Sequence, residues 1–381
     1  MILHIMPDEK FIDYAIELFE FHEPNNNHYV ILHYNKDKKL KYVKSKKVEI
    51  LLGHEILNDK FLKTIHKYEF IVIHQMTASK MRFLQKIPKD IKTVWLGWGG
   101  DFYDLIVGGE KNLYLEKTRL LWKKNDSFFR KILTKIAKNL IYNQVQLRTA
   151  AIQRVDFFGP ILSNEYDLLK KKIPGFKAKF VPFSYAELSE NKFKGVENLT
   201  AHGHNILLGN SSSYTNNHKE AIDLLAHINF QEGKIITPLS YRDPLYRESI
   251  ILYGYEMLGD KFLPLTEFMP LEEYNKVIST CSIVIMNHLR QQGTENINTT
   301  MYLGAKIFLN PQNPVYSFFK NKNAHIFSID ELKTKGTLAF EPLTKLQIDD
   351  NRNILREEYS PEAVETKMKD FLKIIRDDMV N

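Results

Sequence analysis

Short apolar runs alternate with amphipathic stretches along the first half of the chain. The runs are rich in β-branched and aromatic residues, which favour strands. Between two of them, Phe11, Ala15, Leu18 and Phe19 recur at helical spacing. Strands that alternate with helices indicate parallel βαβ units, so the first half predicts a Rossmann-type domain. The predicted strands cover residues 1–6, 29–33, 48–52, 70–74, 93–97, 155–158 and 179–183.

The alternation restarts after a polar segment that we interpret as a linker. Beyond it, strands are predicted near residues 206–208, 234–238, 261–265, 282–286 and 306–309, and helices near 217–228, 271–280 and 298–303. Near the end, Ser360 can cap a helix that starts at Pro361, and apolar residues then follow at helical spacing. The predicted division is an N-terminal domain at 1–186, the linker at 187–205, a C-terminal domain at 206–350 and a helical tail at 351–381.

The predicted fold class is therefore α/β, with two Rossmann-like domains and a long C-terminal helix. Two such domains face each other across a cleft in GT-B glycosyltransferases, and similar pairs occur in sugar epimerases and periplasmic-type binding proteins. Because one fold hosts many functions, the choice among these classes depends on the residues of the site.

Length, composition and charge narrow the class of protein. The 381 residues suffice for two domains, and 44% hydrophobic and 26% charged residues are typical of a folded globular protein. No apolar run approaches the roughly 18 residues that span a membrane, the N-terminus has no signal-peptide pattern, and the single cysteine excludes a disulfide framework. We therefore expect neither a secreted nor an integral membrane protein.

The net charge of +7 is unevenly distributed. Residues 1–185 hold 32 basic and 20 acidic side chains, a net +12, and the remainder carries −5. A basic first half predicts an anionic surface or polyanion as its partner, while the acidic second half is suited to a small ligand.

Two loops of the second domain carry residues suited to a diphosphate. Gly209, Asn210 and Ser211 follow a predicted strand, so their N–H groups and hydroxyls should lie at the carboxyl edge of a sheet, where phosphates commonly bind. Arg290 follows another buried strand, and its guanidinium can fork onto a diphosphate while Gly293 lets the backbone approach. The alternative for the first loop is an ordinary polar turn. The alternative for the second is a solvated loop with a surface arginine.

The first domain offers a candidate general base. Asp101 ends a predicted strand, and the glycines Gly99 and Gly100 before it leave space for its carboxylate to reach an acceptor hydroxyl. Alternatively, Asp101 caps the next turn and Trp98 simply packs. His74 also ends a strand, where a histidine either belongs to the core or lines a cleft.

Residues 127–142 combine an apolar stripe with basic side chains off that stripe, and residues 111–140 hold nine basic and two acidic side chains. Such a helix can lie on an anionic bilayer, and a surface helix packed on its own domain is the alternative. The chain contains no HExxH, Walker A or GxGxxG sequence and no DxD pair in a credible loop, so we expect neither a metal nor a cofactor. It also lacks the signatures of RNA-binding modules, and no nucleic-acid partner is expected.

Four segments together resemble one known family. They are LLGNSSSYTNNH at 207–218, RQQGTEN at 290–296, WLGWGGDFYD at 95–104 and MPLEEYN at 269–275. The chain resembles the TDP-N-acetylfucosamine:lipid II N-acetylfucosaminyltransferases of glycosyltransferase family 56. This resemblance implies a GT-B fold, a TDP-activated 4-amino-4,6-dideoxy sugar (Fuc4NAc type) as donor, and a polyprenyl-diphosphate-linked acceptor at the cytoplasmic membrane face.

The resemblance also assigns several of the site residues. Gly209, Asn210 and Ser211 match the family's GNS turn, the segment 290–293 matches its RQQG loop, and Asp101 matches the aspartate of its W-G-x-D segment. The expected catalytic residues are Asp101 and Arg290. The donor site is expected to comprise Gly209, Asn210, Ser211, Ser212, Tyr241, Gln291, Gln292, Gly293 and Thr294. The acceptor side is expected to comprise His74, Trp98, Gly99 and Gly100.

The sequence thus predicts a metal-independent glycosyltransferase of bacterial surface polysaccharide synthesis, peripheral on the inner face of the cytoplasmic membrane. The alternative hypothesis is a non-catalytic nucleotide-sugar-binding protein at a membrane surface. Nucleotide-sugar turnover that depends on an acceptor separates the two.

Overall fold

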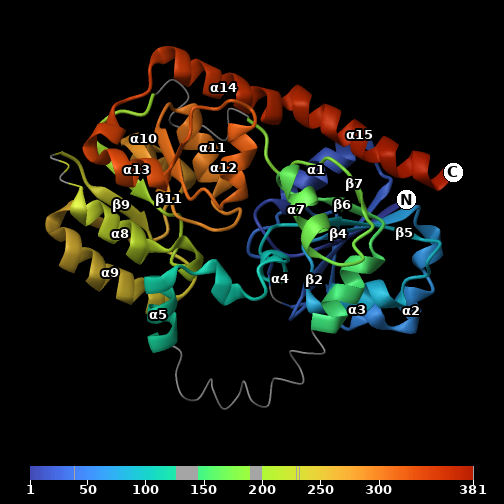
Figure 1. The fold of residues 1–381 in the computed structure, drawn as a ribbon. Coiled ribbons are helices and arrows are strands. Elements are labelled where there is room, and N and C mark those ends of the chain that lie inside the picture. The colour runs from blue at the N-terminus through green and yellow to red at the C-terminus, as the bar shows by residue number, and fades with distance from the viewer. Residues whose placement is uncertain (38, 126–144, 189–199, 229, 231, 381) are drawn as a thin grey trace. The chain divides into compact units, whose positions relative to one another are not determined.

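The computed structural model describes the chain except for residues 38, 126–144, 189–199, 229, 231 and 381. The amphipathic segment predicted at residues 127–142 therefore lies outside the described residues. The chain forms two compact units that are not continuous in sequence (Figure 1). The first unit is Met1–Ile106, Ile132–Glu187 and Glu362–Asn381, and the second is Val107–Lys131 and Leu188–Pro361.

The first unit is built on a seven-stranded sheet with the order β3-β2-β1-β4-β5-β6-β7, and all its pairings are parallel. The central strands are buried along their whole length, which is typical of a parallel sheet covered on both faces. Its strands are β1 Ile2–Met6, β2 Asn27–His33, β3 Val48–Leu52, β4 Phe70–His74, β5 Lys92–Leu96, β6 Phe157–Gly159 and β7 Lys179–Phe180. Its helices are α1 Ile12–His22, α2 Asp59–Leu62, α3 Ala78–Lys86, α4 Tyr103–Ile106, α7 Asn164–Lys172 and α15 Pro361–Val380.

The last helix completes the core of this first unit. Met368, Phe371 and Ile375 of α15 pack with Phe19 of α1 and with buried strand residues. The Arg376 guanidinium fixes the helix further, because Nη1 lies 2.7 Å from Glu23 Oε1 and Nε lies 2.8 Å from Glu69 Oε1. Residues from the two ends of the chain thus share one core.

The connection between β2 and β3 is unusual because it contains no helix. It is held instead by two carboxylates from the β1–α1 region. Asp8 accepts hydrogen bonds from the backbone N–H groups of residues 41–43, and Asp13 accepts them from residues 44 and 45. The connection is therefore fixed to the unit by its backbone.

The second unit contains a six-stranded parallel sheet with the order β10-β9-β8-β11-β12-β13. Its strands are β8 Asn205–Leu208, β9 Ile235–Pro238, β10 Phe262–Leu265, β11 Cys281–Met286, β12 Lys306–Leu309 and β13 Phe327–Ser328. Its helices are α5 Glu116–Asn125, α8 His218–His227, α9 Pro244–Leu258, α10 Leu271–Ser279, α11 Thr294–Tyr302, α12 Pro314–Lys320, α13 Ile329–Lys335 and α14 Lys345–Tyr359.

The predicted strands of both halves are confirmed with small shifts at their ends. The long terminal helix is confirmed too, with α15 starting at Pro361 after a break at Ser360. Ser163 and Asn217 stand at the N-caps of α7 and α8, but neither side chain makes a capping hydrogen bond.

No helix in the part of the chain that the structure describes is both long enough and apolar enough to cross a membrane.

Candidate functional site

Three loops of the second unit meet at the carboxyl edge of its sheet. They follow β9, β8 and β11, which are consecutive neighbours in the sheet. Gln292 Nε2 donates to Asn210 Oδ1 at 2.9 Å, and Asn210 Nδ2 lies 3.4 Å from the Tyr241 hydroxyl oxygen. Asn210 therefore joins residues that are far apart in sequence.

The same loops are held by short polar side chains. Thr215 Oγ1 donates to Gln292 Oε1 at 2.6 Å, and Asn216 Nδ2 lies 3.2 Å from Ser211 Oγ. The backbone N–H of Ser212 donates to the Tyr241 carbonyl at 3.1 Å. These bonds fix the loop after β8 against both of its neighbours.

Two glycines allow the loops to approach this closely. Gly209 has a φ of +67° and Gly293 a φ of +66°, a region that other residues rarely adopt. A Cβ on Gly209 would lie 2.4 Å from His218 Nε2, and a Cβ on Gly293 would lie 3.2 Å from Asn210 Cγ. Glycine is therefore required at both positions for conformation and for space.

Arg290 brings a cation to this cluster. Its Nη1 donates to the Gln291 carbonyl at 2.9 Å, and the side chain is half-buried. Burial, followed by the nearby Arg290 charge, holds the pKa of His288 well below its ordinary value. Gln291 Nε2 donates to Thr294 Oγ1 at 3.3 Å, where α11 begins. The positive end of that helix thus lies directly after Gly293.

Sequence reasoning missed the role of Asn217, which has a φ of +51°. Its Oδ1 accepts from Leu115 N at 2.8 Å, and its Nδ2 donates to the carbonyls of Leu113 and Asn287 at 3.2 and 3.0 Å. One side chain therefore ties the segment before α5 to the loop after β11. The asparagine pair in the SYTNNH sequence was the available signal, but an asparagine before a helix predicts a cap first.

A pocket of about 340 Å³ lies beside Asn287. Seven of its ten lining residues are polar or charged, and they come from the segment leading into α5, from α8, from the loops after β11 and β12, and from α13. The lining residues are Leu115, Glu116, Glu220, Asn287, Asn310, Pro311, Gln312, Ile329, Asp330 and Lys333. Carboxylates, amides and an ammonium together suit a ligand with many hydroxyl or amide groups.

Asp101 of the first unit is a buried carboxylate in the loop after β5, with 5% of the residue exposed. Its Oδ2 accepts from Met76 N at 2.7 Å and from Trp95 Nε1 at 3.0 Å, and its Oδ1 accepts from Trp98 N at 2.9 Å. Burial raises the pKa of Asp101, and these hydrogen bonds oppose that effect without cancelling it. The carboxyl group is thus held in one orientation, closer to neutrality than a solvated aspartate.

The remaining acceptor-side residues lie at the same sheet edge. Gly99 has a φ of +75°, and a Cβ added to Gly100 would meet no atom within 4 Å. His74 is fully buried, with Nε2 lying 3.2 Å from His4 Nδ1 and Nδ1 lying 2.6 Å from the Tyr185 hydroxyl. His74 therefore belongs to a buried polar chain, whereas Gly100 leaves open space.

Lys80 is a second titratable group that the sequence did not reveal. It is buried on α3, and its ammonium donates to the carbonyls of His74 and Gln75. Burial lowers the pKa of Lys80 to about 7, although the Asp101 carboxylate acts in the opposite direction. A lysine on an amphipathic helix predicts a solvated side chain, which is why the pattern did not single it out.

Comparison with known proteins decides the family. The family model described as "4-alpha-L-fucosyltransferase glycosyl transferase group 56" matches residues 134–354, more than half of the chain. The chain belongs to glycosyltransferase group 56. The family predicted from the sequence is thereby confirmed, and this group 56 protein is a glycosyltransferase.

Solved structures agree on the fold. Sucrose-phosphate synthase from Thermosynechococcus elongatus matches with a TM-score of 0.67 at 10% identity, with 99% of each chain covered. The lipopolysaccharide outer core galactosyltransferase WaaB matches at 0.66 and 10% identity, covering 98% of this chain and 99% of its own. HepE from Anabaena, solved with UDP and glucose, matches at 0.63 and 10% identity with the same coverage. The group 56 chain therefore has the GT-B fold.

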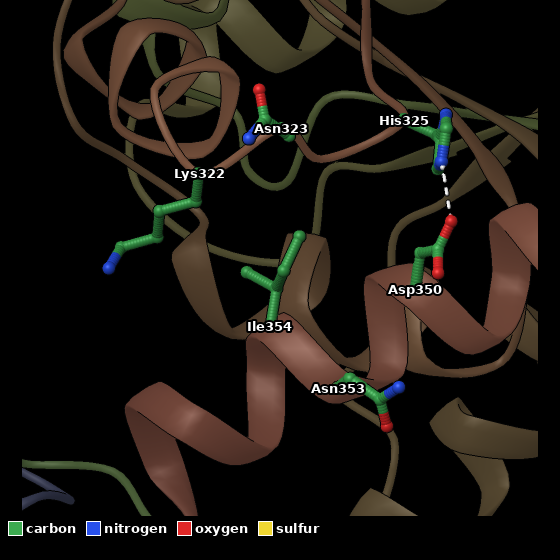
Figure 2. Close-up of a pocket in the computed structure, with 6 residues that line it drawn as sticks. All are labelled: Lys322, Asn323, His325, Asp350, Asn353 and Ile354. Atoms are coloured by element: carbon green, nitrogen blue, oxygen red, sulfur yellow. Dashed lines mark hydrogen bonds and ion pairs between the residues drawn. The ribbon is translucent and has the colours of Figure 1, made fainter.

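Another pocket of the group 56 enzyme contains none of the candidate residues. Its volume is about 440 Å³, and Figure 2 shows His325, from the segment after α12, pointing toward Asp350 of α14. His325 Nε2 lies 3.0 Å from Asp350 Oδ2. Among the described residues, no group of three histidine, cysteine, aspartate or glutamate side chains could hold a metal ion.

Proposed function

We propose that this glycosyltransferase moves a 4-acetamido-4,6-dideoxyhexose from a TDP-sugar to a polyprenyl-diphosphate-linked saccharide in bacterial surface polysaccharide synthesis. The observation that carries the proposal is the junction of three loops around Asn210, together with Arg290, at the start of α11. Membership of a fucosyltransferase family supports a 6-deoxyhexose as the transferred group.

The donor diphosphate belongs at this junction in our proposal. Arg290 and the N–H groups that follow Gly293 supply positive charge and hydrogen-bond donors to an anion. The Ser211 hydroxyl is a further donor from the adjacent strand end in this proposal. The N–H groups of Gly209, Asn210 and Ser212 already bond to Ile285, Asn216 and Tyr241 and hold the loop in place. Because these groups can stabilise the departing diphosphate, the proposed reaction needs no metal.

The glycosyl group of the donor occupies the 340 Å³ pocket in this proposal. The pocket begins at Asn287, which leads into the Arg290 loop, so a diphosphate at that loop would place an attached sugar beside it. Gln312 and Asn310 can hydrogen-bond an acetamido group, and Glu116 or Asp330 can accept from hydroxyls. The UDP and glucose bound by the Anabaena neighbour support a nucleotide sugar as the donor class.

Asp101 acts as the general base in this proposal. The acceptor hydroxyl gives its proton to the carboxylate as its oxygen bonds the anomeric carbon, and the bond from that carbon to the diphosphate breaks. The pKa of Asp101 is raised by burial, which improves a carboxylate as a proton acceptor near neutral pH. Trp98, Gly99 and Gly100 form the acceptor side beside it, and His74 supports them from the buried chain.

Binding and turnover test the proposal in two steps. TDP or UDP should raise the melting temperature of the protein while GDP and ADP leave it unchanged. Transfer from the TDP-sugar should then require a polyprenyl-diphosphate-linked saccharide. Stabilisation by the nucleotide without acceptor-dependent release of TDP would make the chain a nucleotide-sugar-binding protein instead.

A further inference from the structure

The connection between β2 and β3 carries an unusual concentration of lysine. Residues 36–47, here called the lysine strap, contain seven lysines and one aspartate. Every described lysine in the strap is exposed. It leaves β2 at the carboxyl edge of the first sheet and descends beside α1 toward the start of β3.

The strap is held rigidly although its side chains are solvated. Asp8 Oδ1 accepts from Tyr42 N and from Val43 N, each at 3.0 Å, and Asp13 Oδ2 accepts from Lys44 N at 2.9 Å. Val43 is buried in the core of the first unit, and Leu40 packs against that core. The backbone is therefore anchored, and the lysine side chains extend from a fixed support.

Only the two end lysines of the strap form ion pairs among the described residues. Lys36 pairs with Glu55 and Lys47 with Glu20 at the two ends of the strap. In the described part of the chain, no carboxylate forms an ion pair with the four lysines between them, which are Lys39, Lys41, Lys44 and Lys46. Four exposed ammonium groups without an ion pair therefore lie along the strap, and the carboxylates of Asp8, Asp13 and Asp37 offset part of their charge.

The chemistry of these groups favours a broad anionic surface over a compact anion. Lysine carries a strongly hydrated point charge on a flexible stem, whereas tight binding of one phosphate usually recruits arginine forks or buried donors. Each lysine near an anionic bilayer contributes about 1 kcal/mol, and clusters of four to eight basic residues are typical of such contacts.

The strap also lies near the candidate base. The Phe11 ring, between Asp8 and Asp13 in sequence, is 6.1 Å from the Trp98 ring, and Trp98 N donates to Asp101.

We propose that the lysine strap docks the first unit on an anionic lipid bilayer. The inference rests on the proposed function in one respect, because a lipid-linked acceptor would be presented at the surface to which the strap binds.

Vesicle flotation of the full chain tests the inference. The variant K39Q/K41Q/K44Q/K46Q removes the four unpaired charges but keeps Asp8 and Asp13. The matched control K170Q/K171Q/K172Q/K177Q removes four exposed lysines from the last turn of α7 and the segment after it, at the opposite edge of the same sheet. Both variants lower the net charge from +7 equally.

The strap variant should bind vesicles with 30% phosphatidylglycerol at least about tenfold more weakly than the wild type. Binding of the control variant should weaken by less than about twofold. Binding of the wild type should vanish on pure phosphatidylcholine and weaken with salt. Equal loss in both variants, or unchanged binding of the strap variant, would overturn the inference.

Activity in detergent separates this inference from the proposed function. With a detergent-solubilised acceptor, the strap variant should keep the wild-type kcat and KM. A raised KM there would mean that the strap binds the acceptor diphosphate itself, which also overturns bilayer docking. Absence of transfer by the wild type would contradict the proposed function and leave the flotation result valid.

Discussion

Asp101 shows how a residue's surroundings set its chemistry. Its carboxylate is held by Met76, Trp95 and Trp98, and burial raises its pKa. The sequence predicted the position of this aspartate from neighbouring glycines. It did not predict the burial of Lys80 or the partners of His74, because a single lysine or histidine in such a pattern carries no information about its partners.

Asp101→Asn should abolish most transfer while preserving the fold. The amide keeps the shape but cannot take the acceptor proton, so the transfer rate should fall by roughly two to four orders of magnitude. Affinity for TDP, measured by calorimetry, should remain near that of the wild type. The exposed control Asp90→Asn should leave both quantities unchanged, and wild-type transfer by Asp101→Asn would exclude this residue as the base.

Arg290→Ala should reduce turnover by at least about a hundredfold, equivalent to roughly 2.7 kcal/mol of lost transition-state stabilisation. The reason is that the guanidinium would balance charge on the departing diphosphate. Steady-state kinetics with saturating donor measures the effect. Arg82→Ala, which removes an exposed arginine on α3, serves as the control; near-normal turnover of Arg290→Ala would assign that side chain to the solvated surface.

At the scale of elements, strand periodicity was the reliable signal. Buried parallel strands read as continuous apolar runs, and all the predicted ones are present. The helix α9 was missed because its apolar residues lie on more than one face, with Leu245 and Leu252 56% and 72% exposed. No amphipathic stripe marks such a helix.

Gly293→Ala tests whether the loops after β8 and β11 must touch. An alanine there meets both an unfavourable φ and the Asn210 side chain, so TDP affinity should fall about tenfold and stability by about 1 kcal/mol. Gly336→Ala is the control for an alanine at positive φ, since its φ is +54° and a Cβ would meet nothing within 4 Å. It should lose stability but no TDP affinity, as measured by urea denaturation and calorimetry. Equal losses of affinity in both variants would contradict the loop contact.

At the scale of the whole molecule, buried histidines should make stability depend on pH. Burial lowers the pKa of His4 and of His218 to about 3, against an ordinary 6.5. Between these values the unfolded chain binds protons that the folded chain does not, so stability is full above about pH 6.5 and falls as the pH drops toward 3. Each such histidine should lower the free energy of unfolding by about 1.4 kcal/mol when the pH falls from 7.5 to 5.5.

Urea denaturation at pH 7.5 and at pH 5.5 measures this loss of stability. His218→Gln should be less stable than the wild type at pH 7.5, yet lose about 1.4 kcal/mol less on acidification. The exposed control His66→Gln should lose as much as the wild type. An unchanged loss in His218→Gln would show that His218 is not the titrating group.

Arg376→Gln tests the contact that fixes α15 to the first unit. Loss of the bonds to Glu23 and Glu69 should lower the free energy of unfolding of that unit by about 1 kcal/mol, because the guanidinium is partly exposed. Tryptophan fluorescence during urea denaturation follows the unfolding of this unit, since Trp95 and Trp98 lie in it. The control Lys369→Gln, which breaks an exposed ion pair within α15, should change stability by less than about 0.5 kcal/mol. Equal losses of stability in the two variants would show that Arg376 does not fix α15 to the unit.

The place of α15 has a consequence for synthesis on the ribosome. The chain enters translation with the strands of the first unit, yet the helix that completes their core is encoded after the whole of the second unit. Most of residues 188–361 leave the exit tunnel, and can fold, before residues 362–380 do. The core of the first unit is therefore completed after the second unit, and its apolar face around Phe19 stays uncovered and accessible to chaperones until α15 has emerged.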